Sequence, residues 1–548
     1  MRKTAIASQQ PRFKSAGLGV SDPPYLTTDS VPASVGGWDT LSPIAQMPPD
    51  HAVVLDNWIP RPGYLEIRRG SDVFAVTGSS SPVETVMGYN ASNTSSSKLY
   101  AAAGSIIYDI TTGGGADAFS NGFSSGFLTF AQVVTGLTSA RWQYVNFSNS
   151  SSTHYLFIVN GSDHEMVYNG STWANTTFTG PTAGTIIHIA AHKGRLWLVP
   201  TNSTLVWYLA VGAITGAATS FELGDFMTKG GYIQAVATWS VDTRQTVDDY
   251  LCFITSKGQV IVYQGTDPSS STTWALVGVY DVGVPIGRRC FLKVAGDVFI
   301  MTLDGILPLS QMLSTDRTAA NRISLTAMIM DTFRQATNNY SGNYGWQFTA
   351  YPKGTLAIAN IPTATDGSAV QYVMNTLTGA WCRFTGMNAI CWEVFNDVPY
   401  FGSASGKVFQ FDRDSGDAST PIVATAQSAF NYFNARGRRK RYTMVRPLIT
   451  TDHNVNPGVG INVDYGSTGA VSTPTFSGVA GSLWDAAVWD TALWPGENSV
   501  TTSWQSLNGE GFCASIIVQA STIETGLSNG VTLRLNGFDV AMEPGGLL

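Results

Sequence analysis

The sequence predicts an all-β fold, with a β-propeller body of about six to eight blades and a small β-sandwich-like C-terminal platform. Three observations support this prediction. Charged residues make up only 13% of the 548 residues, so the Lys and Glu that favour long soluble helices are scarce. Glycine occurs 56 times and aromatic residues make up 11%, which favours turns and strands. A strand–turn–strand pattern also recurs along the middle of the chain.

The composition also excludes several classes of protein. With 44% hydrophobic residues the chain has enough apolar material for a large core, so it is not a disordered protein. A net charge of −7 argues against a basic protein that coats nucleic acid. The five cysteines are far apart and form no CxxC pair, so we expect neither a disulfide framework nor a zinc site. We expect no signal peptide, because a polar stretch from Ser8 to Arg12 stands where the apolar h-region would follow the start. We also expect no stable membrane insertion, because no run of 18 apolar residues occurs.

Two segments precede the repeats. Residues 1–35 are polar and broken by four prolines, which predicts an extended N-terminal arm. Residues 36–82 form a segment that we expect to join the platform to the propeller. Within it, Pro60 ends one element, and Leu65 and Ile67 alternate as the start of a strand.

Residues 83–413 carry the propeller pattern. Its clearest unit is an apolar strand at 250–255, a turn containing Gly258, and a second apolar strand at 259–263. Six related units begin near Leu99, Tyr155, Leu196, Val298, Leu356 and Val398. Units of about 40–60 residues with two or more strands each are typical of propeller blades, whose sheets cover one another.

One helix interrupts the repeats, and the platform follows them. Ser324 is expected to cap a helix whose apolar positions extend to Phe333. Residues 414–441 are expected to be a linker with a basic run, and residues 442–548 alternate like the strands of a small sandwich.

No motif predicts catalysis, so we expect a protein that is not an enzyme and has no cofactor or metal. A propeller glycosidase needs paired carboxylates, and the acidic candidates show no diagnostic spacing. These candidates are Asp248, Asp249, Asp297, Asp304 and Glu393. His188 and His192 lie in a strand-like stretch without the glutamate of a zinc-binding HExxH motif. The carboxylates of 412–417 favour a solvated turn, with an incidental cation site as the alternative.

The basic run is the main charge cluster of the sequence. It consists of Arg436, Arg438, Arg439, Lys440 and Arg441. Three interpretations stay open: a subunit interface against acidic partners, contact with DNA phosphates, or a solvated loop. Because aromatic residues and arginine often anchor interfaces, we also expect Trp38, Trp58 and Arg61 to lie in subunit contacts.

The segment Gly36–Gly70 resembles the N-terminal signature of tail proteins from short-tailed bacteriophages, a group that includes the tail nozzle, or tubular tail protein B, and the packaged-DNA stabilisation proteins. The matching residues are Gly37, Ala52, Leu55, Asn57, Pro60, Gly63, Arg68 and Gly70. The resemblance implies a structural virion protein that forms a homohexameric ring below the portal and adaptor. Such a ring carries the DNA exit channel without sequence specificity, retains the genome, and supports fibres, tailspikes or a tip. The expected location is therefore the virion tail, after synthesis in the host cytoplasm.

Two alternatives belong to other functional classes. One is a β-propeller glycosidase acting on cell-surface polysaccharide, which requires two carboxylates about 5–10 Å apart at one mouth of the propeller. The other is a glycan-binding module, in which exposed aromatic rings would stack on sugars.

Overall fold

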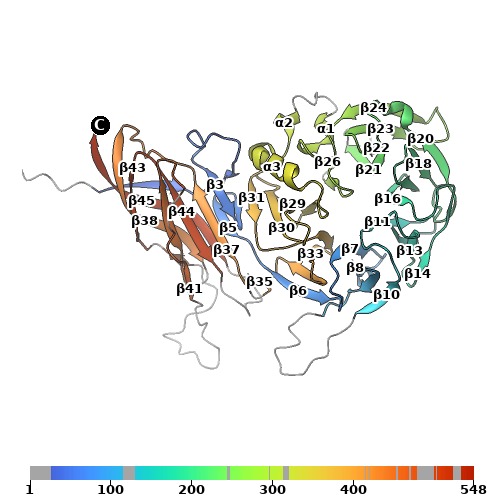
Figure 1. Cartoon of the computed structure of the whole chain (residues 1–548), viewed down its shortest axis with the longest axis horizontal. Coiled ribbons are helices and arrows are strands. Elements are labelled where there is room, and N and C mark those ends of the chain that lie inside the picture. The colour runs from blue at the N-terminus through green and yellow to red at the C-terminus, as the bar shows by residue number, and fades with distance from the viewer. Residues whose placement is uncertain are drawn as a thin grey trace, which may run out of the picture.

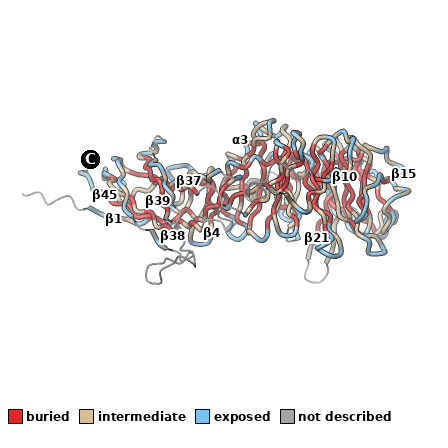
Figure 2. Tube along the Cα trace, turned by 90° about the horizontal axis from the view of Figure 1, so that it is seen from below, coloured by how far each residue is buried: buried red, intermediate tan, exposed pale blue. Residues whose placement is uncertain are grey.

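The computed structural model describes residues 26–114, 130–242, 247–294, 296–312, 320–413, 415–418, 420–451, 454–467, 469, 471–477, 499–501, 503–522 and 532–547. The described part of the chain forms a ring of small sheets beside a platform of two larger sheets (Figure 1). Seen from below, the ring is a flat disc, and the platform extends it to one side (Figure 2).

Seven consecutive sheets make the β-propeller, and the first four contain four antiparallel strands each. Their strands are β7 (Val83–Tyr89), β8 (Lys98–Ala103), β9 (Ile106–Asp109) and β10 (Ala131–Thr135); β11 (Gln143–Ser148), β12 (His154–Val159), β13 (Met166–Tyr168) and β14 (Trp173–Asn175); β16 (Ile186–His192), β17 (Arg195–Pro200), β18 (Leu205–Tyr208) and β20 (Thr219–Glu222); β21 (Ile233–Asp242), β22 (Val247–Thr255), β23 (Gln259–Gly265) and β24 (Trp274–Asp281). The prediction of about six to eight blades is confirmed.

The last three blades include a strand from the N-terminal segment. The fifth blade holds β25 (Phe291–Val294), β26 (Asp297–Thr302) and β27 (Gly305–Pro308); the sixth holds β28 (Gln347–Tyr351), β29 (Leu356–Pro362), β30 (Ala369–Asn375) and β31 (Trp381–Phe384). The seventh holds β32 (Cys391–Phe395), β33 (Val398–Gly402) and β34 (Lys407–Phe411), and its outer strand is β6 (Ser71–Val76). Strand β6 runs antiparallel to β34, with Val73 opposite Phe409, so a strand that precedes the expected propeller start at residue 83 completes its last blade.

The first strand of each blade lines the propeller axis, where β11 contacts β16, β16 contacts β21, and β32 contacts β7. Apolar side chains fill the spaces between neighbouring blades. Between the third and fourth, for example, Trp197 stacks on Trp274 with ring centroids 5.8 Å apart. Each blade therefore buries its faces against its neighbours and needs no separate core.

The expected helix begins later than the sequence predicts. Helices α1 (Leu309–Met312), α2 (Ala320–Ile323) and α3 (Met330–Tyr340) lie between the fifth and sixth blades. The Ser324 hydroxyl donates to the Ile306 carbonyl (3.2 Å) and accepts from the Thr326 amide (3.2 Å), so it caps a turn rather than α3. Phe333 is fully buried, as its apolar position predicts. No helix in the described ranges is long and apolar enough to cross a membrane.

The platform is a sandwich built from both ends of the chain. One sheet contains β4 (Trp58–Arg61), β5 (Tyr64–Ile67), β45 (Leu533–Leu547), β38 (Arg438–Thr451), β42 (Ser499–Thr501), β43 (Gln505–Gly511) and β1 (Thr27–Pro32). The other contains β3 (His51–Asp56), β37 (Val423–Ser428), β44 (Ala514–Ser521), β40 (Gly458–Val463) and β2 (Gly37–Trp38). Leu55, Val445 and Val518 belong to the core between the two sheets.

The platform and propeller share a continuous sheet, because β3 pairs in parallel with β31 of the sixth blade through Asp56 and Arg383. Residues 27–32 of the expected arm form β1 on β45, while residues 1–25 lie outside the described part. The expected linker 414–441 contains strand β37 and the start of β38. The remaining short strands are β15 (Phe178–Thr179), β19 (Gly216–Ala217), β35 (Gly416–Asp417), β36 (Thr420–Pro421), β39 (Asn454–Asn456) and β41 (Thr475–Ser477).

Candidate functional site

Four residues of the N-terminal segment that carry the resemblance, Gly37, Asn57, Arg68 and Gly70, lie where the platform meets the propeller. Asn57 lies between β3 and β4 in the left-handed region (φ 59°), which asparagine adopts more readily than most residues. Its side-chain Nδ2 donates to Thr385 Oγ1 (2.9 Å) and to the Val423 carbonyl (2.7 Å). Its Oδ1 accepts from the Thr385 amide (2.9 Å). One side chain thus connects the end of the sixth blade to strand β37 of the platform.

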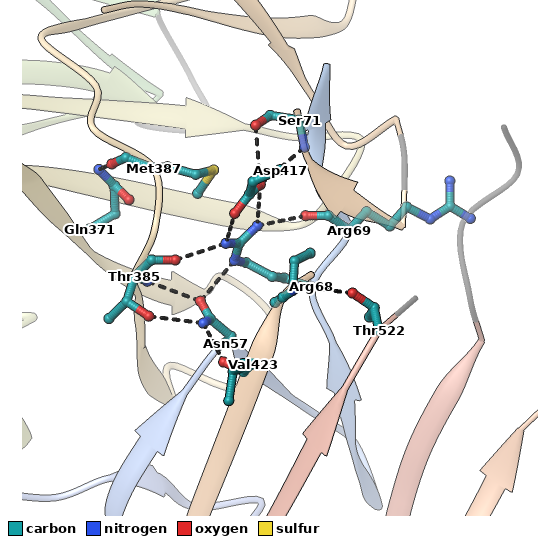
Figure 3. A network of polar contacts seen from close by, with 11 residues as sticks. Asn57, Arg68, Arg69, Ser71, Gln371, Thr385, Met387, Asp417, Val423 and Thr522 are labelled. Atoms are coloured by element: carbon teal, nitrogen blue, oxygen red, sulfur yellow. Dashed lines mark hydrogen bonds and ion pairs between the residues drawn. The ribbon is translucent and has the colours of Figure 1, made fainter. Parts of the chain in front are cut away.

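Arg68 is the centre of this junction (Figure 3). Its side chain is fully buried and its Nε donates to Asn57 Oδ1 (2.8 Å). The guanidinium forms a two-pronged ion pair with Asp417, with Nη1 3.0 Å from Oδ1 and Nη2 bonded to Oδ2. It also donates to the carbonyls of Thr385 (2.8 Å) and Arg69 (3.1 Å). A planar guanidinium with this many fixed acceptors locks the junction in one geometry.

Two glycines of the signature permit close backbone approaches at the same place. A Cβ on Gly70 would lie 1.9 Å from the Gly416 carbonyl oxygen, next to Asp417. Gly37 has φ +88°, and a Cβ there would lie 2.8 Å from backbone atoms of Trp381 on β31. Side chains at these positions would push the platform segment away from the propeller, which is the physical reason for glycine.

The basic run lies on the first residues of β38 and its preceding turn. Arg436, Arg438, Arg439 and Arg441 are exposed. Arg439 Nε lies 3.5 Å from Glu510 on β43, and Arg441 Nη1 lies 3.9 Å from Glu543 on β45.

Lys440 differs from its neighbours, because its side chain points into the platform. Its Nζ donates to the carbonyls of Ala435 (2.8 Å), Arg438 (3.1 Å) and Phe512 (2.6 Å), and burial lowers its pKa. Side chains alternate between the two faces of a strand, so Lys440 points inward while Arg439 and Arg441 point outward. The five cations of the basic run do not show this difference in the sequence.

The three interface candidates of the N-terminal segment lie within the chain's own contacts. Trp38 is buried edge-on against Tyr372, with centroids 5.3 Å apart, and Trp58 is fully buried in the platform core. Arg61 is partly buried: it donates to Glu66 (3.0 Å), to the Gly354 carbonyl (3.0 Å) and to Thr355 Oγ1 (2.6 Å). Trp38 and Arg61 thus connect the N-terminal segment to the sixth blade, whereas Trp58 belongs to the platform core.

A second candidate site opens at one mouth of the propeller axis, where a cavity of about 620 Å³ lies among loops of several blades. Arg141, Arg288 and Arg289 line it, with Glu84 and Tyr344. The sequence gives no signal for this group of three arginines, because they come together only when the blades close into a ring.

Buried polar groups lie deeper on the axis. The Tyr144 hydroxyl donates to the Glu393 carboxylate, and burial raises the pKa of Glu393 to about 7. Arg289 donates to Thr85 Oγ1 (2.9 Å) and to the carbonyls of Glu84 (3.2 Å) and Trp142 (3.2 Å). Glu393 was one of the acidic candidates of the sequence, but its Tyr144 partner was not predicted.

The other sequence candidates have structural roles. His188 lines a smaller cavity of about 180 Å³ on the axis, and burial lowers its pKa to about 4, so it is neutral at pH 7. Asp249 pairs with Lys193 (2.9 Å) and Asp297 accepts from Ser310 (2.5 Å). Asp417 binds Arg68, and Asp412 accepts from Tyr351 (2.7 Å). No cluster of three potential metal ligands occurs within the described ranges.

The fold defines the chain as an all-β propeller protein with a sandwich platform. No known protein family and no curated protein matches its sequence. Similar solved structures include the computationally designed Ika8 protein, at 12% identity and TM-score 0.34, covering 63% of this chain and 100% of that one. They also include Sqt1 of Saccharomyces cerevisiae (9%, TM-score 0.32, 63% and 100%) and Raptor of Chaetomium thermophilum (9%, TM-score 0.37, 63% and 29%). At these identities the similarity concerns the fold alone.

Proposed function

We propose that this chain is a structural subunit of a short-tailed bacteriophage tail, the nozzle that forms a homohexameric ring below the portal and adaptor. In this role the ring carries the DNA exit channel, retains the packaged genome and supports fibres or a tip. The protein acts as a scaffold and not as an enzyme.

The observation that carries the proposal is the position of the signature residues. Of the eight residues that carry the resemblance, Asn57, Arg68 and Gly70 build the joint between platform and propeller. A ring subunit must transmit force between its neighbours and whatever is attached to its outer part. A buried, multiply bonded arginine at the joint suits that task, because it resists hinge motion.

The exposed arginines supply a surface for assembly. Arg438, Arg439 and Arg441 are exposed at the N-terminal end of β38, which we call the basic edge. The carboxylates of Glu510 and Glu543 lie 3.5 Å from Arg439 and 3.9 Å from Arg441. Exposed pairs of this kind contribute little to the stability of a monomer, so the arginines can exchange partners when another subunit docks.

The test is the mass of the purified full chain by mass photometry and native mass spectrometry. We expect a particle of about 350 kDa, six times the 58.5 kDa subunit. A charge-reversed variant R438E/R439E/R441E is expected to shift the population to smaller species. Its control reverses three exposed cations of the propeller, K257E/K353E/R413E.

Thermal unfolding of the two triple variants distinguishes a loss of assembly from a loss of folding. Both triple variants should keep the thermal unfolding midpoint of the native chain to within a few degrees. A native chain that stays monomeric at micromolar concentration, alone and with an adaptor ring from a short-tailed phage, overturns the nozzle proposal. Equal ring formation by both variants overturns the role given to the basic edge.

The axial mouth favours a second candidate function, the binding or hydrolysis of surface polysaccharide. The supporting observation is a carboxyl group with a pKa near 7, Glu393, beneath a pocket lined by arginines. Release of reducing sugar from acidic capsular polysaccharide, abolished in Glu393→Gln, would support hydrolysis. Its absence, together with a ring of six, leaves the nozzle as the function.

A further inference from the structure

The pocket at the axial mouth contains an arginine, Arg288, that no carboxylate of the described ranges neutralises. Arg288 follows β24 in the loop that leads into the fifth blade, and its guanidinium is at the wall of the 620 Å³ cavity. Its Nη1 donates to the Asn160 carbonyl (2.8 Å). Among the described residues, no carboxylate forms an ion pair with Arg288.

The two neighbouring arginines are already engaged. Arg141 pairs with Glu84 at 2.9 Å and lies over the Tyr344 ring at 4.2 Å. Arg289 donates to the backbone carbonyls of Glu84 and Trp142 and to the Thr85 hydroxyl. Its positive charge also interacts with the Glu393 carboxylate. Of these three arginines, Arg288 is therefore the one whose guanidinium can bind an incoming anion. The positive charge of its two neighbours adds to its attraction for one.

The rest of the lining suits a hydroxylated ligand. Ser139, Ser162, Ser341 and Asn343 place short hydroxyl and amide side chains around the same cavity. Its volume falls in the range of small-molecule sites, roughly 300–1,000 Å³, and is far larger than a bare phosphate requires. Two carboxylates also line the cavity: Glu84, which is paired with Arg141, and Asp366, which accepts from the Ser368 amide. The guanidinium of Arg288, with hydroxyl and amide side chains around the same cavity, matches a sugar that carries a carboxylate.

We propose that this axial pocket binds a carboxylate-bearing sugar unit, such as a uronic acid residue of a bacterial surface polysaccharide. Arg288 takes the carboxylate through its free N–H groups, and the serine and asparagine side chains take the ring hydroxyls. This inference rests on the second candidate function, polysaccharide binding at the axial mouth, and names the sugar that the pocket takes. Because a single chain forms the site, it does not rest on the hexameric ring or on hydrolysis.

The test uses the purified full chain and D-glucuronate as the probe, with D-glucose and inorganic phosphate as comparisons. Saturation-transfer NMR detects the sugars, and titration gives the dissociation constants. We expect glucuronate to bind in the millimolar range and at least tenfold more tightly than glucose. Arg288→Ala should weaken glucuronate binding at least tenfold, whereas Arg288→Lys, which keeps the charge but loses the fork, should give an intermediate loss.

Arg439→Ala is the matched control, because Arg439 is an exposed arginine on strand β38 of the platform and is not among the residues that line the axial pocket. It should bind glucuronate like the native chain. Equal affinity in Arg288→Ala, or equal binding of glucose and glucuronate, overturns the proposal. Displacement of glucuronate by phosphate at equal concentration shows a general anion site and overturns the sugar assignment.

Discussion

Removal of the Arg68 guanidinium tests whether the buried junction holds the platform against the propeller. The Arg68→Ala change deletes the donor of five hydrogen bonds, two of which reach Asp417. The Asp417 side chain is only 13% exposed, so its charge remains buried without a counter-charge. Breaking a buried ion pair from one side costs about 3–5 kcal/mol of unfolding free energy.

This cost converts into a measurable shift of the melting temperature. Unfolding entropy of about 2.1 cal/mol/K per residue gives roughly 1.2 kcal/mol/K for 548 residues. If the chain melts as one unit, differential scanning calorimetry should therefore show a decrease of about 3–4 °C. A larger decrease is expected if the platform melts separately, because the same loss of free energy is then divided by the smaller unfolding entropy of fewer residues.

The neighbouring arginine provides the control. Arg69 has a side chain that is 53% exposed and lies 3.9 Å from Asp412. Arg69→Ala should therefore shift the melting temperature by less than about 1 °C. The double change R68A/D417A should destabilise less than the sum of the two single changes, since it removes the unpaired charge. Equal melting temperatures for Arg68→Ala and Arg69→Ala would refute the reasoning.

Three further perturbations test other parts of the structure. Lys440→Ala leaves three carbonyls without their buried donor and should cost about 2–4 kcal/mol by calorimetry, against less than about 0.5 kcal/mol for the exposed Arg439→Ala. Gly70→Ala forces a Cβ against the Gly416 carbonyl and should cost about 1–3 kcal/mol, whereas Gly342→Ala meets open space and should leave the melting temperature unchanged. Burial raises the pKa of Glu393 from its ordinary value of 4.5 to about 7, so between these two values the unfolded chain releases a proton that the native state keeps, and stability falls as pH rises. The melting temperature of the native chain should fall relative to Glu393→Gln between pH 5 and 7, by the equivalent of roughly 1–3 kcal/mol, and the two profiles should run parallel above about pH 8. Parallel profiles of the two proteins between pH 5 and 7 would contradict this last assignment.

Individual strands and turns could be predicted, because apolar alternation and turn glycines are visible within a few consecutive residues. The strand pair 250–263 is an apolar alternation around a Gly turn, and the structure has β22 and β23 with that pairing. His188 and His192 lie on strand β16, as their apolar surroundings predict. Repetition of this pattern also indicates a propeller, because sheets that are apolar on both faces must stack on each other.

The basic run and the helix show where such local reasoning ends. Strand alternation turned one cation of the run, Lys440, into the core, and the register depends on pairing with β43 and β45. A serine that has the chemistry of a helix cap, Ser324, hydrogen-bonds to the preceding blade instead, because its partner Ile306 is brought there by the tertiary fold.

Local patterns are enough to predict the all-β class and the blade repeat, because alternation and turn residues are properties of short segments. The partners of Arg68 depend on the closed fold instead: Arg68 and Asp417 are 349 positions apart and meet because β6 completes the last blade, which places Ser71 beside Asp417. The axial arginines likewise converge from separate blades. The apolar alternation of a strand reflects which of its side chains are buried, so it can be recognised in a short segment. A contact between residues hundreds of positions apart, such as Arg68 and Asp417, forms only when the whole ring closes and its free energy outweighs the entropy lost by the intervening chain.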